Sequence, residues 1–183
     1  MVAVSGFQTI GVDNLTPHIG AEIDGVDLSK DLSNEQFSEI YQAWLDWKVI
    51  VFRDQHISRD QHKAFGRKFG SLHVHPMKHH YQGDPEILTI RTTKNSVYTA
   101  GNGWHTDVTC DEIPPLGSML YIKETPVSGG GDTLYADMYL AYELLSEKMK
   151  ELLTGLVAVH DGALPYLRNY KVAAPNGQEY PKN

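Results

Sequence analysis

The stretch Trp104-His105-Thr106-Asp107 decides how this chain is interpreted. On a strand, His105 and Asp107 project from the same face, roughly 6 to 7 Å apart, because alternate residues of a strand share a face. An imidazole and a carboxylate placed in this way can bind one metal ion. The spacing therefore predicts two ligands of a metal site, and a third ligand has to come from elsewhere.

Length and composition predict one globular domain. The chain has 183 residues, of which 41% are hydrophobic and 21% are charged, and it can bury a single core. We therefore expect residues 1–183 to form one domain. The formal net charge is −7 and no run of Lys or Arg occurs, which argues against a nucleic-acid partner, since nucleic-acid binding depends on neutralising phosphates. A small molecule is the expected partner.

Cysteine content and hydropathy indicate the compartment. Cys110 is the single cysteine, so it cannot form an internal disulfide, and we interpret it as a small buried side chain. The N-terminal residues contain no apolar stretch that is typical of a signal peptide or a membrane span. These observations predict a cytoplasmic protein with no membrane partner.

The first half of the chain combines strand patterns with amphipathic helices. We predict a strand at Ile19–Leu28 with a turn at Asp24-Gly25, and a second strand at Lys48–Arg53. Helices are expected to begin at Ser33 and Ser58, because each serine is followed three residues later by a glutamine, which is a capping-box pattern. The second of these helices is expected to end at Gly70.

The second half predicts further strands and one more helix. Strands are expected at residues 86–91, 116–123, 132–136 and 156–160, and a helix at Tyr139–Leu153. Beyond Gly162 the periodicity fades, and no further apolar strand precedes Asn183. The pattern predicts an α+β fold with a mostly antiparallel sheet and outer helices. Because its sheet would keep an open edge, we expect that C-terminal strands are missing and that the domain is incomplete.

The surroundings of His105-Thr106-Asp107 make a metal site more specific than the tripeptide alone. An isolated H-x-D also occurs by chance, as an ordinary surface histidine and aspartate. Here Trp104, which we expect to pack behind the motif, precedes it, and Pro114-Pro115 and the turn at 129–133 follow. Two histidines and one carboxylate with open coordination positions form the facial triad of non-haem Fe(II) oxygenases.

With these segments the chain resembles the taurine dioxygenase family of Fe(II)- and 2-oxoglutarate-dependent oxygenases. The resemblance runs over essentially the whole chain, with the matched segments in the same order. They are Pro17–Ile23, Val49–Gln55, Phe69-Gly70, His73–Pro76, Trp104–Asp107, Gly130–Thr133 and Gly155-Leu156. The resemblance implies a double-stranded β-helix, the jelly-roll core of cupin-like proteins, with helices outside it and the iron site inside the barrel.

The resemblance also implies the cofactors and the reaction. His105 and Asp107 would be the catalytic iron ligands, and Thr133 would hydrogen-bond the distal carboxylate of 2-oxoglutarate. A histidine and a carboxylate leave coordination positions open for the oxo-acid and for O2. The implied reaction hydroxylates a substrate C–H bond and releases succinate and CO2.

Four residues are candidates for substrate binding. His75 matches a family position that binds the anionic head of the substrate, although by residue pattern alone it is one histidine of a His-rich loop. Lys78 replaces a tyrosine of taurine-specific members and is either an ion-pair partner for an anion or a solvated lysine. Asn102 lies in the approach to the motif, and Tyr166 falls where the family places an aromatic residue against the substrate. We expect a small anionic substrate, such as a sulfonate, a sulfate ester or an aryloxy acid, rather than taurine.

Two residues that the family uses have no counterpart in the chain. The third iron ligand, a distal histidine, and the arginine that clamps 2-oxoglutarate lie in C-terminal segments of the family, and His160 comes too early to replace that histidine. We therefore expect an N-terminal portion of a dioxygenase that is inactive or nearly so by itself. The alternative is a non-catalytic jelly-roll binding module or a truncated gene product. The oligomeric state is open, although the family often forms homodimers or homotetramers.

Overall fold

The computed structural model describes residues 6–75, 83–96 and 101–162. The chain divides into two compact units. The first consists of Met1–Leu72 and Tyr121–Gly155, and the second of His73–Leu120 and Leu156–Asn183. Each unit has its own architecture, and the expectation of a single domain over residues 1–183 stays a prediction.

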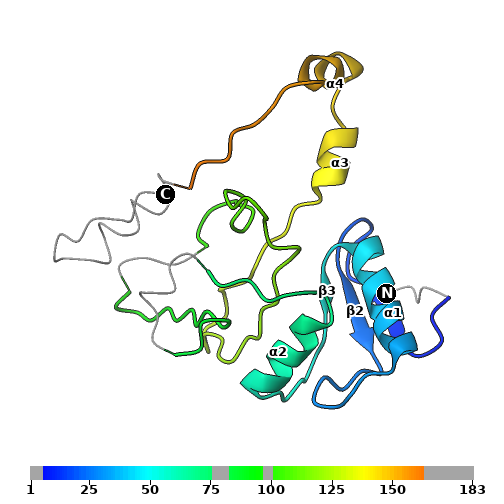
Figure 1. Ribbon diagram of the computed structural model, residues 1–183, viewed down its shortest axis with the longest axis vertical. Coiled ribbons are helices and arrows are strands. Elements are labelled where there is room, and N and C mark those ends of the chain that lie inside the picture. Colours follow the sequence, from blue (N-terminus) through cyan, green and yellow to red (C-terminus); the bar gives the residue numbers. More distant parts are fainter. Residues whose placement is uncertain (1–5, 76–82, 97–100, 163–183) are drawn as a thin grey trace. The chain divides into compact units, whose positions relative to one another are not determined.

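The first unit contains every helix and strand that the structure describes (Figure 1). The strands are β1 (Gly11–Asn14), β2 (Ala21–Asp24) and β3 (Ile50–Val51), and the helices are α1 (Asn34–Trp47), α2 (Arg59–Arg67), α3 (Met138–Glu143) and α4 (Glu147–Leu153). β2 lies in the middle of the sheet, antiparallel to β1 and parallel to β3. The predicted mixture of helix and sheet is confirmed, whereas the double-stranded β-helix stays a prediction.

The core of the first unit lies between α1 and the three-stranded sheet (Figure 1). Ile40 and Ala43 on α1 and Ala21 on β2 are completely buried. The other buried apolar side chains are Ile10, Val12, Ile23, Leu28, Leu32, Ile57 and Phe65. Among the described residues, the buried apolar core is therefore built entirely from positions between 10 and 65.

Both predicted helix starts are confirmed by hydrogen bonds. Ser58 and Gln61 form a complete capping box before α2, in which Ser58 Oγ accepts from the backbone N–H of Gln61 at 3.2 Å and Gln61 Oε1 accepts from the backbone N–H of Ser58 at 2.7 Å. Ser33 Oγ accepts from the backbone N–H of Gln36 at 3.1 Å, but the Gln36 side chain donates to the carbonyl of Gly25 instead. The second cap is therefore only half of a capping box.

The predicted ends of the helices are less accurate than their starts. α2 ends at Arg67, ahead of Gly70, and successive N–H groups then bond the carbonyls three residues back. The helix predicted at Tyr139–Leu153 is two helices, because Ser146 leaves the helical conformation and caps α4 through the backbone N–H of Met149 at 3.3 Å. None of the helices described here is both long and apolar enough to cross a membrane.

The predicted strands after α2 are wrong. Residues 86–91, 116–123, 132–136 and 156–160 form no ladder with any part of the chain that the structure describes. A strand requires a neighbouring backbone with aligned donors and acceptors. Alternation of apolar residues decides which face a strand would bury, but it does not provide that neighbour. Several of these apolar side chains are consequently exposed, among them Leu120, Ile122, Leu134 and Val157.

Candidate metal centre

His105 and Asp107 belong to the second unit and lie in an irregular segment rather than on a strand. Residues 104–106 have no regular secondary structure and residues 107–110 form a turn. Val108 has a φ of 45°, which places this β-branched residue in the left-handed region and reverses the chain directly after Asp107. The predicted strand is therefore wrong, although the turn still brings the two side chains together.

The two predicted donor atoms lie at a separation suited to one metal ion. His105 Nε2 is 3.1 Å from Asp107 Oδ1. Two donors bound at about 2.1 Å to neighbouring octahedral positions of a divalent metal are about 3.0 Å apart. The side chains of His105 and Asp107 therefore fit two adjacent positions of such a metal.

The hydrogen bonding of His105 supports the same interpretation. Its Nδ1 lies 2.7 Å from the carbonyl oxygen of Gly103, and because a carbonyl oxygen only accepts, Nδ1 carries a proton. In the neutral imidazole, the lone pair then lies on Nε2 and faces a carboxylate oxygen of Asp107. Two acceptors at 3.1 Å repel each other unless a positive charge lies between them or the ring is doubly protonated. Nδ1–H donation to a backbone carbonyl with the metal on Nε2 is typical of metal-binding histidines.

Asp107 is also held by a second hydrogen bond. Its Oδ2 accepts from the hydroxyl of Ser118 at 2.5 Å. The two carboxylate oxygens therefore have different surroundings, because Oδ1 faces His105 and Oδ2 faces Ser118. An arrangement of this kind favours one oxygen over the other as a metal ligand.

The described residues supply two candidate metal ligands and not a third. Within 6–75, 83–96 and 101–162, no three histidine, cysteine or acidic side chains come together as a metal site. The side chains of His105 and Asp107 are 54% and 50% exposed, so a third donor has open space to approach. The third histidine of the facial triad stays a prediction.

A second histidine–carboxylate pair lies in the same unit. His73 Nε2 is 2.7 Å from Asp111 Oδ2, and this contact joins the segment that carries His75 to the end of the Asp107 turn. Burial and the neighbouring His73 lower the pKa of His75 below its ordinary value, against the opposing effect of Asp107 and Asp111. His75 is therefore neutral at pH 7 and can interact with an anion by hydrogen bonding rather than by charge.

The other predicted site residues are not brought together by the described structure. Asn102 is exposed in the loop before His105, and Thr133 is exposed in the first unit. Lys78 and Tyr166 lie outside the described residues. The expectation that Trp104 packs behind the motif is wrong, since this residue is 73% exposed. The reason is the same as for the missing strand, because without a ladder behind it the indole has no surface to cover. Cys110 is only partly buried.

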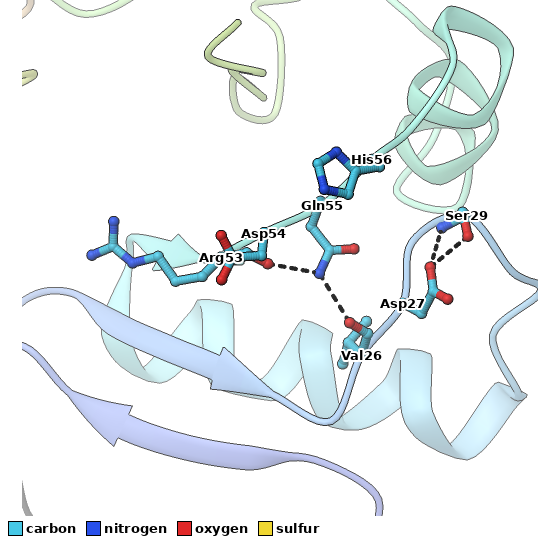
Figure 2. A pocket seen from close by; sticks show the side chains of 7 residues that line it. All are labelled: Val26, Asp27, Ser29, Arg53, Asp54, Gln55 and His56. Atoms are coloured by element: carbon cyan, nitrogen blue, oxygen red, sulfur yellow. Dashed lines mark hydrogen bonds between the residues drawn. The ribbon is translucent and has the colours of Figure 1, made fainter. Parts of the chain in front are cut away.

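A separate polar pocket lies in the first unit and contains none of the predicted site residues. It has a volume of about 380 Å³ and is lined by Val26, Asp27, Ser29, Arg53, Asp54, Gln55 and His56 (Figure 2). Gln55 donates to the carbonyls of Val26 and Arg53, both at 3.0 Å, and accepts from the backbone N–H of Leu28. Ser29 and Lys30 lower the pKa of Asp27 to about 2. Because these groups are already hydrogen-bonded to one another, the pocket is better explained as part of a loop that its own hydrogen bonds stabilise than as a binding site.

Three contacts in this unit could not be predicted from the sequence. They join Ser118 to Asp107, the Gly103 carbonyl to His105, and His73 to Asp111. Ser118 is eleven residues from Asp107, and Asp111 is 38 residues from His73. No motif or spacing connects these positions, because the contacts depend on how the turn after Asp107 folds back.

Comparisons with known proteins show which family and which proteins the chain is similar to. Residues 11–181 match the family described as "Taurine catabolism dioxygenase TauD, TfdA family". The chain is 37% identical over 163 residues to an alkylsulfatase of Acinetobacter baylyi, covering 87% of this chain and 49% of that protein. It is 35% identical over 160 residues to an alpha-ketoglutarate-dependent sulfonate dioxygenase of Saccharomyces cerevisiae, covering 81% of this chain and 38% of that protein.

A solved structure is similar over the same region. The crystal structure of a taurine dioxygenase from Burkholderia xenovorans aligns with a TM-score of 0.61 at 31% sequence identity, covering 81% of this chain and 52% of that one. The chain thus spans about half the length of this protein and of the alkylsulfatase, and less than half of the yeast relative.

Proposed function

Because the chain belongs to the taurine catabolism dioxygenase family, we propose that the protein is an Fe(II)- and 2-oxoglutarate-dependent dioxygenase that hydroxylates a small anionic organic molecule. The single observation that carries the proposal is the contact of 3.1 Å between His105 Nε2 and Asp107 Oδ1, a separation that suits two ligands in adjacent positions of one metal. The double-stranded β-helix core is part of the same proposal.

The chain's own residues have distinct roles in this proposal. His105 and Asp107 hold Fe(II), with the Nδ1–H of His105 fixed on the Gly103 carbonyl. When bound, Fe(II) together with 2-oxoglutarate and O2 supplies the chemistry that inserts oxygen into a C–H bond and yields succinate and CO2. Thr133 is proposed to donate a hydrogen bond to the distal carboxylate of 2-oxoglutarate.

The proposed substrate is a sulfonate, a sulfate ester or an aryloxy acid. Relatives are named as dioxygenases for a sulfonate, a sulfate ester and 2,4-dichlorophenoxyacetate, and all of these compounds carry an anionic group. A neutral His75, whose pKa is lowered by burial and by His73, would orient this group by hydrogen bonding. Lys78 would supply the opposite charge, and Asn102 and Tyr166 would contact the remainder of the substrate.

An anaerobic metal titration tests the proposal directly. In a full-length version of the protein, we expect that Fe(II) and 2-oxoglutarate added together produce a visible charge-transfer absorption, and that O2 then yields succinate when a suitable anion is present. His105→Ala and Asp107→Ala should abolish the absorption and the turnover. His160→Ala changes an exposed histidine away from the motif and should leave both unchanged. Unchanged turnover in the first two variants contradicts the proposal.

The same titration distinguishes a dioxygenase from the alternative, a non-catalytic jelly-roll binding module. The observation that favours this alternative is that the described residues supply two metal ligands and no third. A binding module would give no charge-transfer absorption with 2-oxoglutarate under any condition. The expectation that the 183-residue chain alone has little activity stays a prediction, as do a cytoplasmic location and a homo-oligomeric state.

A further inference from the structure

We propose that Ser118 is a positioning residue for the metal centre, which fixes the carboxylate of Asp107 so that Oδ1 and not Oδ2 faces the metal. This inference rests on the function proposed above. It assigns a role to a residue that lies eleven positions beyond the H-x-D motif, in a segment that the sequence predicts to be an ordinary strand.

The hydrogen bond between Ser118 and Asp107 joins a hydroxyl to a carboxylate. The hydroxyl Oγ is 2.5 Å from Oδ2, which is within the range of charge-assisted bonds from a hydroxyl to a carboxylate. An ionised carboxylate only accepts, so Ser118 is the donor. The hydroxyl bond is therefore directed at one defined oxygen of Asp107.

A carboxylate without such a partner does not hold one orientation. The terminal torsion of aspartate is broad and nearly two-fold, so either oxygen can face a ligand at little cost. The side chain of Asp107 is half-exposed, which means that packing does not restrict it. The Ser118 hydroxyl on Oδ2 selects one orientation of this carboxylate and leaves Oδ1 on the side of His105 Nε2 before a metal arrives.

The two metal ligands are supported in the same way. His105 Nδ1 donates to the Gly103 carbonyl at 2.7 Å, and Asp107 Oδ2 accepts from the Ser118 hydroxyl. In each ligand the atom that does not face the metal is the one that is hydrogen-bonded. Outer partners of this kind orient metal ligands, and their loss typically lowers metal affinity by about 10- to 100-fold.

A Co(II) titration of the full chain without oxo-acid tests this role separately from catalysis. The dissociation constant and the visible ligand-field absorption are measured for the wild type, Ser118→Ala, Ser118→Thr and Asp107→Ala. We expect Ser118→Ala to weaken Co(II) binding by about 10- to 100-fold and to alter the absorption intensity. Ser118→Thr keeps the hydroxyl and should retain wild-type affinity. Asp107→Ala should abolish binding.

Matched controls separate this role from a structural one. Ser128→Ala removes an exposed hydroxyl from the turn at Pro126–Gly129 and should leave Co(II) affinity unchanged. Far-UV circular dichroism checks that each variant is folded, and if Ser118→Ala does not fold, Ser118→Val is compared with Ser118→Thr, which has nearly the same shape. Loss of affinity in the valine variant alone supports the proposal.

Two kinds of result overturn the inference, and they are distinguishable. If Asp107→Ala abolishes binding while loss of the Ser118 hydroxyl leaves the affinity and the absorption unchanged, the role of Ser118 is wrong and the metal centre stands. If the wild type does not bind Co(II), or if Asp107→Ala has no effect, the metal centre itself fails, and the inference about Ser118 fails with it.

Discussion

Residues 10–65 and residues 101–120 are stabilised by different kinds of interaction. The first region contains all the buried apolar side chains of the described core, two capped helices and the sheet. The second contains the candidate metal ligands, no helix or strand, a left-handed Val108 and donor side chains that are half-exposed. Burial stabilises the first region, whereas individual hydrogen bonds hold the second. We therefore expect mutations in the first region to change the free energy of unfolding, and mutations in the second to change binding or local stability.

The largest expected effect on stability is at the centre of the first region. Ile40 is completely buried between α1 and the sheet. Ile40→Ala should lower the free energy of unfolding by about 2 to 5 kcal/mol, because it removes buried methyl groups and leaves a cavity. Urea denaturation followed by far-UV circular dichroism measures the change. Leu45→Ala removes a side chain of the same size from α1 that is 53% exposed, and it should cost much less. Equal losses would mean that burial against the sheet is not what stabilises α1.

Removal of the α2 cap should have an intermediate effect. Ser58→Ala loses the acceptor for the backbone N–H of Gln61, and we expect a loss of about 0.5 to 2 kcal/mol in the free energy of unfolding. Ser38→Ala, at an exposed position inside α1, is the control and should be neutral, since alanine is favourable in a helix. A neutral Ser58→Ala would show that the capping box only reports the helix start and does not stabilise it.

A mutation in the second region should increase local stability. Val108 has a φ of 45°, a conformation that costs an ordinary L-residue roughly 1 to 2 kcal/mol. Val108→Asn should recover up to about 1 kcal/mol, because asparagine adopts this conformation more readily. Slower hydrogen exchange of the amides at 101–120 would be the measured sign. Thr109→Asn, one position further on, should give no such gain, and faster exchange in Val108→Asn would contradict the expectation.

The smallest expected effect concerns the pH dependence of the first region. The hydrogen bond from the Thr9 hydroxyl lowers the pKa of Glu39 below its ordinary value of 4.5. Burial opposes this effect, and the backbone N–H groups of Gln8 and Thr9 add to it. A lowered pKa means that the folded state prefers the ionised form, so this stabilisation is complete above pH 4.5 and is lost as the pH falls through the lowered pKa. Melting temperatures between pH 7 and pH 3 should therefore fall less steeply in Glu39→Gln than in the wild type.

An exposed glutamate on the same helix provides the comparison for Glu39. Glu35 lies in the first turn of α1, and Glu35→Gln should leave the shape of the pH profile nearly unchanged. If Glu39→Gln and Glu35→Gln gave the same profile, the hydrogen bonds from Thr9 and Gln8 would not be the origin of the acid sensitivity.

The sequence predicted the local features of the first region well, because their partners are close along the chain. Ser33 and Ser58 begin helices as their spacing indicates, since the cap and the N–H group that it binds are three residues apart. The turn at Gly25 is also found, with a φ of 78° that favours glycine. The strands predicted at 86–91 and 116–123 are not found, since a ladder depends on a distant backbone that periodicity does not identify.

For the candidate site, the sequence by itself determined which side chains are candidate metal ligands and which family the chain resembles. His105 and Asp107 were identified from residue type and spacing alone, and the resemblance is confirmed over residues 11–181. Only the tertiary structure decided how these ligands are held. The turn at Val108 brings His105 Nε2 to 3.1 Å from Asp107 Oδ1. The Gly103 carbonyl is hydrogen-bonded to Nδ1 of His105, and the Ser118 hydroxyl to Oδ2 of Asp107. The physical reason is that residue type fixes the donors of a site, whereas their orientation depends on hydrogen bonds to groups that the folded chain brings alongside.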